Sequence, residues 1–257
     1  MRGIARWVGG MAVAMAVFGT FVSCSRKDAS PLSITDGPDG ADAPAPGTFT
    51  GLDYVEVITG GADRSAELPV VIAIHGLGDT PEHMSGLFAD APFAARFILP
   101  RGTESLPIGY SWFPIHVPVR PDDPVRIAPR VQKAAQRLCR FVASAALSRK
   151  PLVLGHSQGG MLAYTMAVTC PEDIGLAAPV AGFLPPPLLP DIRPRHYRPI
   201  RAFHSIDDRL VPHDFDARSV DGLRALGLDA TLQSFPGGEH RITPDQRDAL
   251  LKLIANW

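Results

Sequence analysis

The residue best suited to do chemistry is Ser157, which lies between Gly155 and Gly159 in a Gly-x-Ser-x-Gly motif. An apolar run precedes this motif and a helix-forming run follows it, giving the strand, tight turn and helix of a nucleophile elbow. In such a turn the serine hydroxyl is exposed near a helix N-terminus, where positive partial charge favours a developing anion. The motif therefore predicts a nucleophilic serine. The alternative is a glycine-rich connection whose serine only caps the helix.

A catalytic serine needs a base to accept its proton and an acid to orient that base. Asp207 and Asp208 follow one predicted strand, and His240 follows the next strand in a glycine-containing turn. Serine, acid and histidine occur in this order along α/β-hydrolase chains. We therefore expect Ser157 as nucleophile, His240 as general base and one of the two aspartates as orienting acid. Only one can reach His240, because adjacent residues at a strand end point in different directions.

These residues need a scaffold, and the apolar pattern predicts one in which strands alternate with helices. Such alternation is typical of an α/β fold, a mostly parallel sheet flanked by helices on both faces. We expect a short antiparallel start to the sheet at the first strand. The candidate residues follow strands, at the carboxyl edge where ligands bind. The predicted strands are residues 52–58, 69–74, 96–100, 152–155, 177–183, 199–204 and 230–235, and the predicted helices are 127–147, 158–169, 213–226 and 244–256.

With these motifs in place, the sequence resembles the phospholipase/carboxylesterase family of α/β-hydrolases, which includes acyl-protein thioesterases and bacterial carboxylesterases. The similarity extends from about Leu68 to the C-terminus. Four segments carry it: His75-Gly76-Leu77-Gly78-Asp79-Thr80, Ser111-Trp112-Phe113, Gly155 to Gly160, and Asp208-Arg209-Leu210-Val211-Pro212 with His240.

The resemblance implies an α/β-hydrolase fold and a serine hydrolase that cleaves carboxylic esters or thioesters through an acyl-enzyme, without a cofactor. It assigns Ser157 as nucleophile and His240 as general base. It favours Asp208 over its neighbour as the acid, because the Asp-x-x-Val-Pro match begins there. The family's oxyanion hole, formed by two backbone N–H groups, falls on Leu77 and Gln158.

The chain departs from the family pattern at two positions. His156 stands where phenylalanine is common, and Pro114 where an aspartate is common after Trp-Phe. These departures leave the triad intact and the acyl preference open. Trp112 and Phe113 could form the wall of an acyl pocket, although aromatic residues near a sheet more often belong to the core.

The other histidines are expected to be structural. His75 and His204 each end a predicted strand and would bond backbone near the site, whereas His156 could contact substrate or pack. His213 begins a predicted helix, where capping or exposure is the default. We expect no metal, because the spacings match no ligand pattern, and no cofactor, because no dinucleotide or phosphate-cradling motif is present.

Two other functions remain open from the residues alone. A serine peptidase of the same fold would use the same triad, and a non-catalytic, surface-displayed domain could bind a partner. A complete triad weighs against the binding domain. The net charge of −1 gives no reason to expect nucleic acid as a partner, so a small ester or thioester is the expected one. No oligomeric state is predicted.

The N-terminus has the pattern of an export signal. Arg2 and Arg6 precede an uncharged apolar run over residues 7–22, which predicts a signal peptide over 1–23. The four residues that end at Cys24 resemble the lipobox of bacterial lipoproteins, so Cys24 is the candidate lipid attachment site. The alternative is an ordinary secretory signal that is cleaved nearby.

A flexible tether is predicted over residues 24–47, which are rich in proline, glycine and aspartate, and the catalytic domain over 48–257. We therefore expect an exported protein of the bacterial cell envelope. It would be lipid-anchored at the outer membrane or periplasm and touch the membrane only through its N-terminal anchor, or otherwise be secreted.

The remaining cysteines, Cys139 and Cys170, are expected to stay unbridged. Cys139 lies about eight residues before the end of its predicted helix, and Cys170 lies at the end of its own. If both helices end at the same level, the two residues are offset by roughly 12 Å, at ~1.5 Å per residue. A disulfide needs Cα atoms within about 7 Å.

Overall fold

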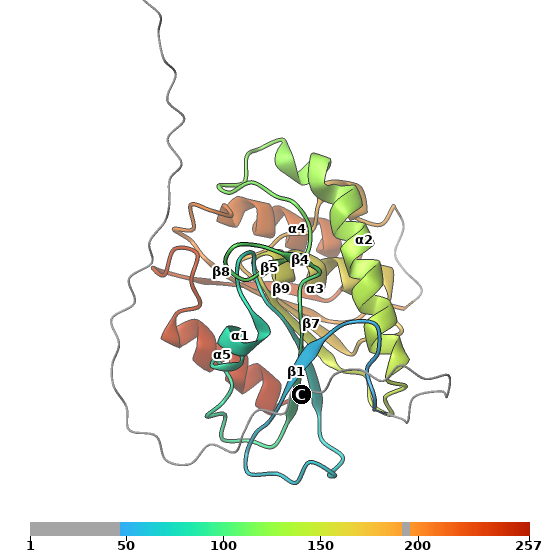
Figure 1. Cartoon of the computed structure of the whole chain (residues 1–257). Coiled ribbons are helices and arrows are strands. Elements are labelled where there is room, and N and C mark those ends of the chain that lie inside the picture. Colours follow the sequence, from blue (N-terminus) through green and yellow to red (C-terminus); the bar gives the residue numbers. More distant parts are fainter. Residues whose placement is uncertain (1–46, 192–195) are drawn as a thin grey trace, which may run out of the picture. The chain divides into compact units, whose positions relative to one another are not determined.

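The apolar stretches of the sequence form one seven-stranded sheet in the computed structural model, which describes residues 47–191 and 196–257 (Figure 1). The strand order is β1-β3-β2-β6-β7-β8-β9, and only β1 runs antiparallel to its neighbour. The α/β expectation is confirmed. The strands are β1 Tyr54–Ile58, β2 Val70–Ile74, β3 Arg96–Pro100, β6 Leu152–His156, β7 Leu176–Val180, β8 Ile200–Ser205 and β9 Ala230–Phe235.

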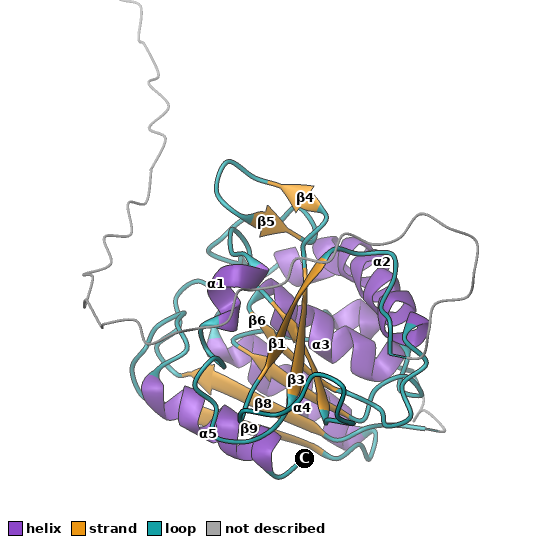
Figure 2. Cartoon of the chain, turned by 60° about the horizontal axis from the view of Figure 1, so that its bottom comes forward, coloured by secondary structure: helices purple, strands orange, loops and turns teal. Residues whose placement is uncertain are grey.

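Helices cover both faces of the sheet because the parallel strands are apolar on both sides. In β2, Ile72 and Ile74 pack into one core while Val71 and Ala73 pack into the other. Figure 2 shows the strands between two groups of helices. The first core is covered by α2 Asp123–Ser144, α3 Gln158–Thr169 and α4 His213–Ala225, and the second by α1 Pro81–Ser85 and α5 Pro244–Ala255.

The predicted signal peptide, the candidate lipid site Cys24 and all but the last residue of the predicted tether lie outside the described residues. Within the described part of the chain, no helix is both long and apolar enough to cross a membrane.

Helix α2 differs most from its prediction, since it spans Asp123–Ser144 and not residues 127–147. It starts earlier because Pro124 lies in the first turn, where the missing N–H would have no helical partner. It also ends earlier than predicted, and Ala146 just beyond it has a φ of 45°, which a right-handed helix does not contain. Three short elements lacked a periodic signal and were not predicted: α1, the 3₁₀ turn Pro186–Leu188 and a hairpin of β4 Glu104–Ser105 and β5 Tyr110–Ser111.

The hairpin matters for function because it packs on the loop that follows β2. Gly78 donates its N–H to the Tyr110 carbonyl at 2.8 Å. Gly109 has a φ of 66°, and a Cβ there would lie 2.2 Å from the Gly78 oxygen. A glycine is therefore required where the hairpin meets this loop.

The prediction of free cysteines was wrong. A disulfide joins Cys139 and Cys170, whose Cα atoms are 6.1 Å apart. Cys139 lies only five residues before Ser144, the last residue of α2, and Cys170 directly follows α3. Helix α2 therefore continues by more than one turn beyond the disulfide, whereas α3 ends at it. The two helices do not end at the same level, so the axial offset that we expected between Cys139 and Cys170 does not exist.

We expect the variant carrying Cys139→Ala and Cys170→Ala to fold but to be less stable. The disulfide spans a sequence separation of 31 residues, and releasing a loop of that size costs about 4 kcal/mol. The melting temperature of the variant should fall by roughly 7–15 °C. Reductant should lower the melting temperature of wild type by a similar amount and should not affect the variant. A peptide map without reductant that shows both cysteines alkylated would contradict the disulfide.

Candidate active site

Ser157 occupies a turn that only a glycine-rich sequence can form. It follows β6 with φ 56° and ψ −113°, a conformation that costs of order 1–3 kcal/mol for a non-glycine residue. A Cβ at Gly155 would lie 2.0 Å from the Gly159 oxygen, and one at Gly159 would lie 2.0 Å from the Ile74 oxygen. The two glycines therefore let α3 start directly against β2 and β6, with Ser157 at its N-terminal end.

Ser157, His240 and Asp208 form one hydrogen-bonded series. The Ser157 hydroxyl lies 2.8 Å from His240 Nε2, and His240 Nδ1 lies 2.7 Å from Asp208 Oδ2. The donors are Ser157 Oγ–H and His240 Nδ1–H, which leaves Nε2 free to accept the serine proton. Three elements far apart in the chain, the β6–α3 turn, the β8–α4 loop and the β9–α5 loop, supply the three side chains.

Asp208 is fixed by donors on both of its oxygens. Oδ1 accepts the N–H groups of Leu210 and Val211, each at 2.9 Å, while Oδ2 faces His240. Burial alone would raise the pKa of Asp208, but contacts with His204 and His240 outweigh it and hold this pKa well below its usual range. Asp207 is exposed, so the structure brings Asp208 and not its neighbour to His240.

The turn that carries His240 also needs glycines. Gly237, Gly238 and Glu239 all have positive φ, and a Cβ at Gly238 would lie 2.2 Å from the Thr243 methyl group. His156 holds this turn from the elbow side, because its Nε2 lies 3.2 Å from the His240 carbonyl oxygen and the two rings are in contact.

Burial and the nearby His240 lower the pKa of His156 to about 3, which favours the neutral ring. Because the His240 carbonyl oxygen can only accept, the proton of the His156 ring lies on Nε2, which donates to it. Of the two roles open to His156 from the sequence, the structure gives it packing and positioning against His240.

Both residues expected to supply the oxyanion hole adjoin Ser157, Gln158 in the chain and Leu77 through its neighbour Gly76. Gln158 directly follows Ser157, and a Cβ at Gly76, the neighbour of Leu77, would lie 3.3 Å from the Ser157 Cβ. In the described residues, no hydrogen bond occupies the N–H of Leu77 or of Gln158. Both groups are free to donate to an anion that forms beside the serine.

Buried side chains hold the loop of Leu77 in place. His75 donates from Nδ1 to the Gly76 carbonyl and accepts the Gly102 N–H at Nε2, at 2.7 and 2.9 Å. Burial lowers the pKa of His75, which fits this neutral, backbone-bonded role. Trp112 donates its indole N–H to the His75 carbonyl at 3.0 Å. The structural role expected for His75 is therefore the one observed.

The Gln158 side chain fastens the elbow to the segment after the hairpin. Its Oε1 accepts the Trp112 N–H at 3.1 Å, and its Nε2 donates to the Phe113 carbonyl at 2.7 Å. Trp112 and Phe113 are 4% and 2% exposed and belong to the first core. They also line a surface pocket of about 200 Å³ together with Pro114 and Arg130.

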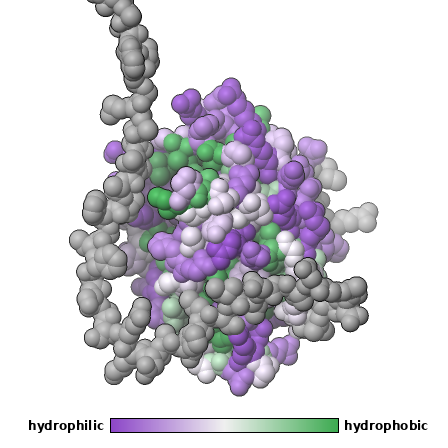
Figure 3. Space-filling view, in the orientation of Figure 1, coloured by the Kyte–Doolittle hydropathy of each residue, from purple (hydrophilic) through white to green (hydrophobic). Residues whose placement is uncertain are grey.

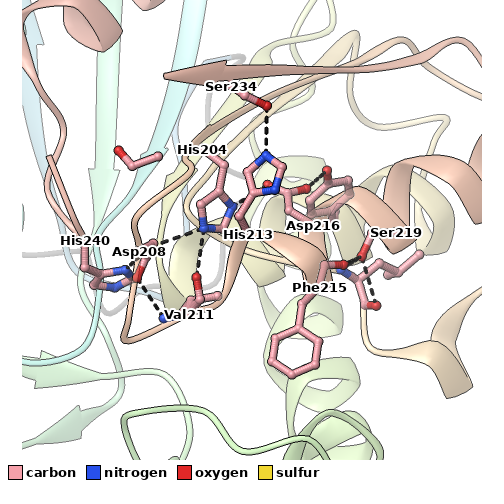
Figure 4. Close-up of polar contacts among 12 residues, drawn as sticks. His204, Asp208, Val211, His213, Phe215, Asp216, Ser219, Ser234 and His240 are labelled. Carbon is pink, nitrogen blue, oxygen red and sulfur yellow. Dashed lines mark hydrogen bonds and ion pairs between the residues drawn. The ribbon is translucent and has the colours of Figure 1, made fainter. Parts of the chain in front are cut away.

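A second polar cluster lies behind Asp208 (Figure 4). His204 Nε2 is 3.2 Å from Asp208 Oδ2, and His204 Nδ1 is 2.8 Å from Asp216 Oδ2. Tyr164 donates its hydroxyl to the other oxygen of Asp216. His213, at the start of α4, lies beside His204 and is 2.8 Å from Ser234.

Sequence reasoning missed Asp216 and Tyr164. The only signal for Tyr164 was its place in a helix that is apolar throughout, and an aspartate early in a helix usually faces solvent. His204 was expected to bond backbone, and it does so at the Val211 carbonyl, 2.9 Å from its Nε2. Among the described residues, no cluster of three histidine, cysteine, aspartate or glutamate side chains could hold a metal ion.

Comparisons with known proteins find relatives over most of the described chain. The profile of the phospholipase/carboxylesterase family matches residues 54–257. Acyl-protein thioesterase 1 of Gibberella zeae is 26% identical over 212 residues, which cover 72% of this chain and 88% of that protein. Carboxylesterase SOBER1 of Arabidopsis thaliana is 22% identical over 209 residues, 73% of this chain and 88% of the relative.

Solved structures show the same fold. Esterase PE8 superposes with a TM-score of 0.70 at 22% identity, covering 80% of this chain and 99% of its own. The Bacillus cereus carboxylesterase superposes with a TM-score of 0.60 at 15% identity, covering 79% of this chain and 94% of its own.

Proposed function

The chain belongs to the phospholipase/carboxylesterase family, and from this premise we propose that it is a serine hydrolase that cleaves carboxylic esters or thioesters. The observation that carries the proposal is the hydrogen-bonded series from Ser157 through His240 to Asp208. A nucleophile, a base and an orienting acid in this order are what acyl transfer to a serine requires.

In the acylation step, Ser157 Oγ attacks the acyl carbon while His240 Nε2 accepts its proton. The ionised Asp208 stabilises the resulting imidazolium through the 2.7 Å contact with Nδ1. The N–H groups of Leu77 and Gln158 hold the oxyanion of the tetrahedral intermediate. His240 then protonates the leaving alkoxide or thiolate, and the acyl group remains on Ser157.

In the deacylation step, His240 removes a proton from water, which attacks the acyl-enzyme. The same two N–H groups hold the second oxyanion, and His240 returns the proton to Ser157 as the acid leaves. Apart from the substrate and water, these steps use only side chains and backbone groups of the chain.

We also propose that exposed apolar side chains of the hairpin and of the loop after β8 contact the acyl group of the substrate. The hairpin that packs on the Leu77 loop carries Leu106 and Ile108, which are 36% and 80% exposed, and Ile206 beyond β8 is 60% exposed. Most of the face seen in Figure 3 is hydrophilic, and apolar residues gather in a smaller area.

The function is tested with a fluorophosphonate probe and a panel of p-nitrophenyl esters of graded chain length. We expect covalent labelling of Ser157 and turnover of the esters, with peptide substrates inert. No labelling and no turnover would favour the non-catalytic binding domain, and cleavage of peptides alone would favour a peptidase.

We also propose that the protein is exported and attached to the cell envelope through a lipid on Cys24. The basic and apolar N-terminus and the polar tether after Cys24 support this proposal. The disulfide between Cys139 and Cys170 supports export as well, because disulfides persist in oxidising compartments outside the cytosol.

We expect the wild type in the membrane fraction and the Cys24→Ser variant in soluble fractions or unprocessed. A multiply acylated cysteine binds the bilayer firmly, since each buried CH₂ contributes ~0.8 kcal/mol. Metabolic labelling with a fatty-acid analogue tests the attachment directly, with Cys24→Ser as the unlabelled control. A wild-type chain without label would leave ordinary secretion as the explanation.

A further inference from the structure

His204 is a fully buried histidine that lies between two carboxylates. It is 0% exposed, with Asp208 Oδ2 3.2 Å from its Nε2 and Asp216 Oδ2 2.8 Å from its Nδ1 (Figure 4). Asp216 is itself 0% exposed. The oxygen of Asp208 that His204 approaches is the same oxygen that faces His240. The catalytic histidine and a buried one therefore share one acceptor atom.

The contacts of His204 fix where its protons lie. Nε2 faces two acceptors, the Val211 carbonyl oxygen and Asp208 Oδ2, so Nε2 carries a proton. Nδ1 faces Asp216 Oδ2. Burial raises the pKa of Asp216, whereas its contacts with His204 and with the Tyr164 hydroxyl favour the ionised form. With Asp216 ionised, both ring nitrogens of His204 donate and the ring is an imidazolium.

The electrostatics agree with this protonation. Burial opposes the charged form, but the contacts with Asp208 and Asp216 outweigh it and raise the pKa of His204 to about 9. The titratable groups around His204 are Asp208 from the loop after its own strand, Asp216 and His213 from α4, Tyr164 from α3, His156 from β6 and His240 from the loop after β9.

We propose that His204 is a positioning residue for the hydrolysis reaction, held as an imidazolium by Asp216 and Tyr164. It adds an ion pair at Oδ2 to the two backbone N–H groups that hold Oδ1 of Asp208, and it offsets part of the negative charge that His240 experiences. This inference rests on the proposed function, because it gives His204 its role through the Asp208–His240 pair.

The physical consequence concerns the attraction between Asp208 and the catalytic histidine. An imidazolium beside Asp208 weakens the attraction that this carboxylate exerts on a protonated His240. An uncharged His204 would leave that attraction at full strength and favour the protonated His240, which cannot act as a base. Removal of the charge on His204 should move the acid limb of the activity profile to higher pH.

Asp216→Asn is expected to leave His204 uncharged, with little change in the shape of the side chain at position 216. The new amide can donate to Nδ1 of a neutral His204 while its oxygen accepts the Tyr164 hydroxyl, so every hydrogen bond has a replacement. Tyr164→Phe removes only the donor to Asp216 and should act in the same direction, more weakly. Ser219→Ala is the matched control, because Ser219 lies on α4 in the same buried region but bonds only backbone groups of residues 184 and 215.

Two measurements are made on the full-length wild type and the three variants. The first is imidazole ¹⁵N NMR, which reports the protonation of His204 and the titration midpoint of His240 without any need for turnover. The second is the pH dependence of kcat/KM for a p-nitrophenyl ester. For Asp216→Asn we expect the titration midpoint of His240 and the midpoint of the acid limb of kcat/KM each to rise by about half a pH unit to one pH unit. We expect a smaller rise for Tyr164→Phe and none for Ser219→Ala.

The outcomes separate this inference from the proposed function. A neutral His204 in the wild type at pH 7, or a His240 midpoint unchanged in Asp216→Asn, overturns the positioning role even if the enzyme is active. A loss of activity without a shift in midpoint would mean that the cluster is only structural, and it also overturns the role. A wild type that hydrolyses no ester and does not react with the fluorophosphonate probe refutes the proposed function instead.

Discussion

Ser157→Ala is expected to abolish ester hydrolysis and leave the fold intact. The substitution removes the atom that attacks the substrate, and loss of a triad member commonly lowers the rate by on the order of 10⁴ to 10⁶. The hydroxyl bonds the His240 imidazole at 2.8 Å, and the turn itself is held by glycines and by backbone bonds of residue 157 to Val180 and Met161. The measurement is kcat/KM with a p-nitrophenyl ester, together with a thermal melt.

Ser219→Ala is a suitable control for this experiment, because it removes another buried serine hydroxyl that lies outside the triad. It should keep most of the activity. Fluorophosphonate labelling should be lost in Ser157→Ala and kept in the control. A folded Ser157→Ala protein that retained most of its turnover would show that another residue is the nucleophile.

Asp208→Asn is expected to lower kcat/KM on the order of 10³- to 10⁴-fold, far more than Asp207→Asn. Donors surround both oxygens of Asp208: two backbone N–H groups at Oδ1 and two histidines at Oδ2. An asparagine must turn its NH₂ group toward one of these pairs, and in either orientation donor faces donor. The amide also cannot stabilise a protonated His240 as the carboxylate does.

Asp207→Asn provides the matched comparison, since it makes the same chemical change on an exposed neighbour. Its kcat/KM should stay within about twofold of wild type. Thermal melts of both variants would separate a loss of catalysis from a loss of folding. If Asp207→Asn proved to be the inactive variant, the role of the orienting acid would pass to that residue.

Local sequence patterns determined much of the scaffold. Residues 96–100 and 230–235 were predicted as strands and residues 158–169 as a helix, and all three are observed with those bounds. Each has a continuous or alternating apolar pattern with clear breaks at its ends, and such patterns act through neighbours in the chain. Elements too short to have a period, such as α1 and the β4–β5 hairpin, could not be recognised in this way.

The candidate triad was also predictable in part, because the order of Ser157, the aspartate pair and His240 along the chain places each at the carboxyl end of a strand. The choice between the two aspartates needed more than this order. It depends on which carboxylate the β8–α4 loop directs inward, and the N–H groups of Leu210 and Val211 fix that direction.

Tertiary structure alone decided two further features. The Cys139–Cys170 disulfide depends on the levels at which α2 and α3 end, and a pattern within either helix does not encode those levels. The contact of His204 with Asp216 joins β8 to α4 through side chains whose types favour a surface position. Strands and helices could be predicted from the sequence because they form through contacts between residues that are close in the chain. The disulfide and the His204–Asp216 contact could not, because the packing of whole helices against the sheet sets which distant side chains meet.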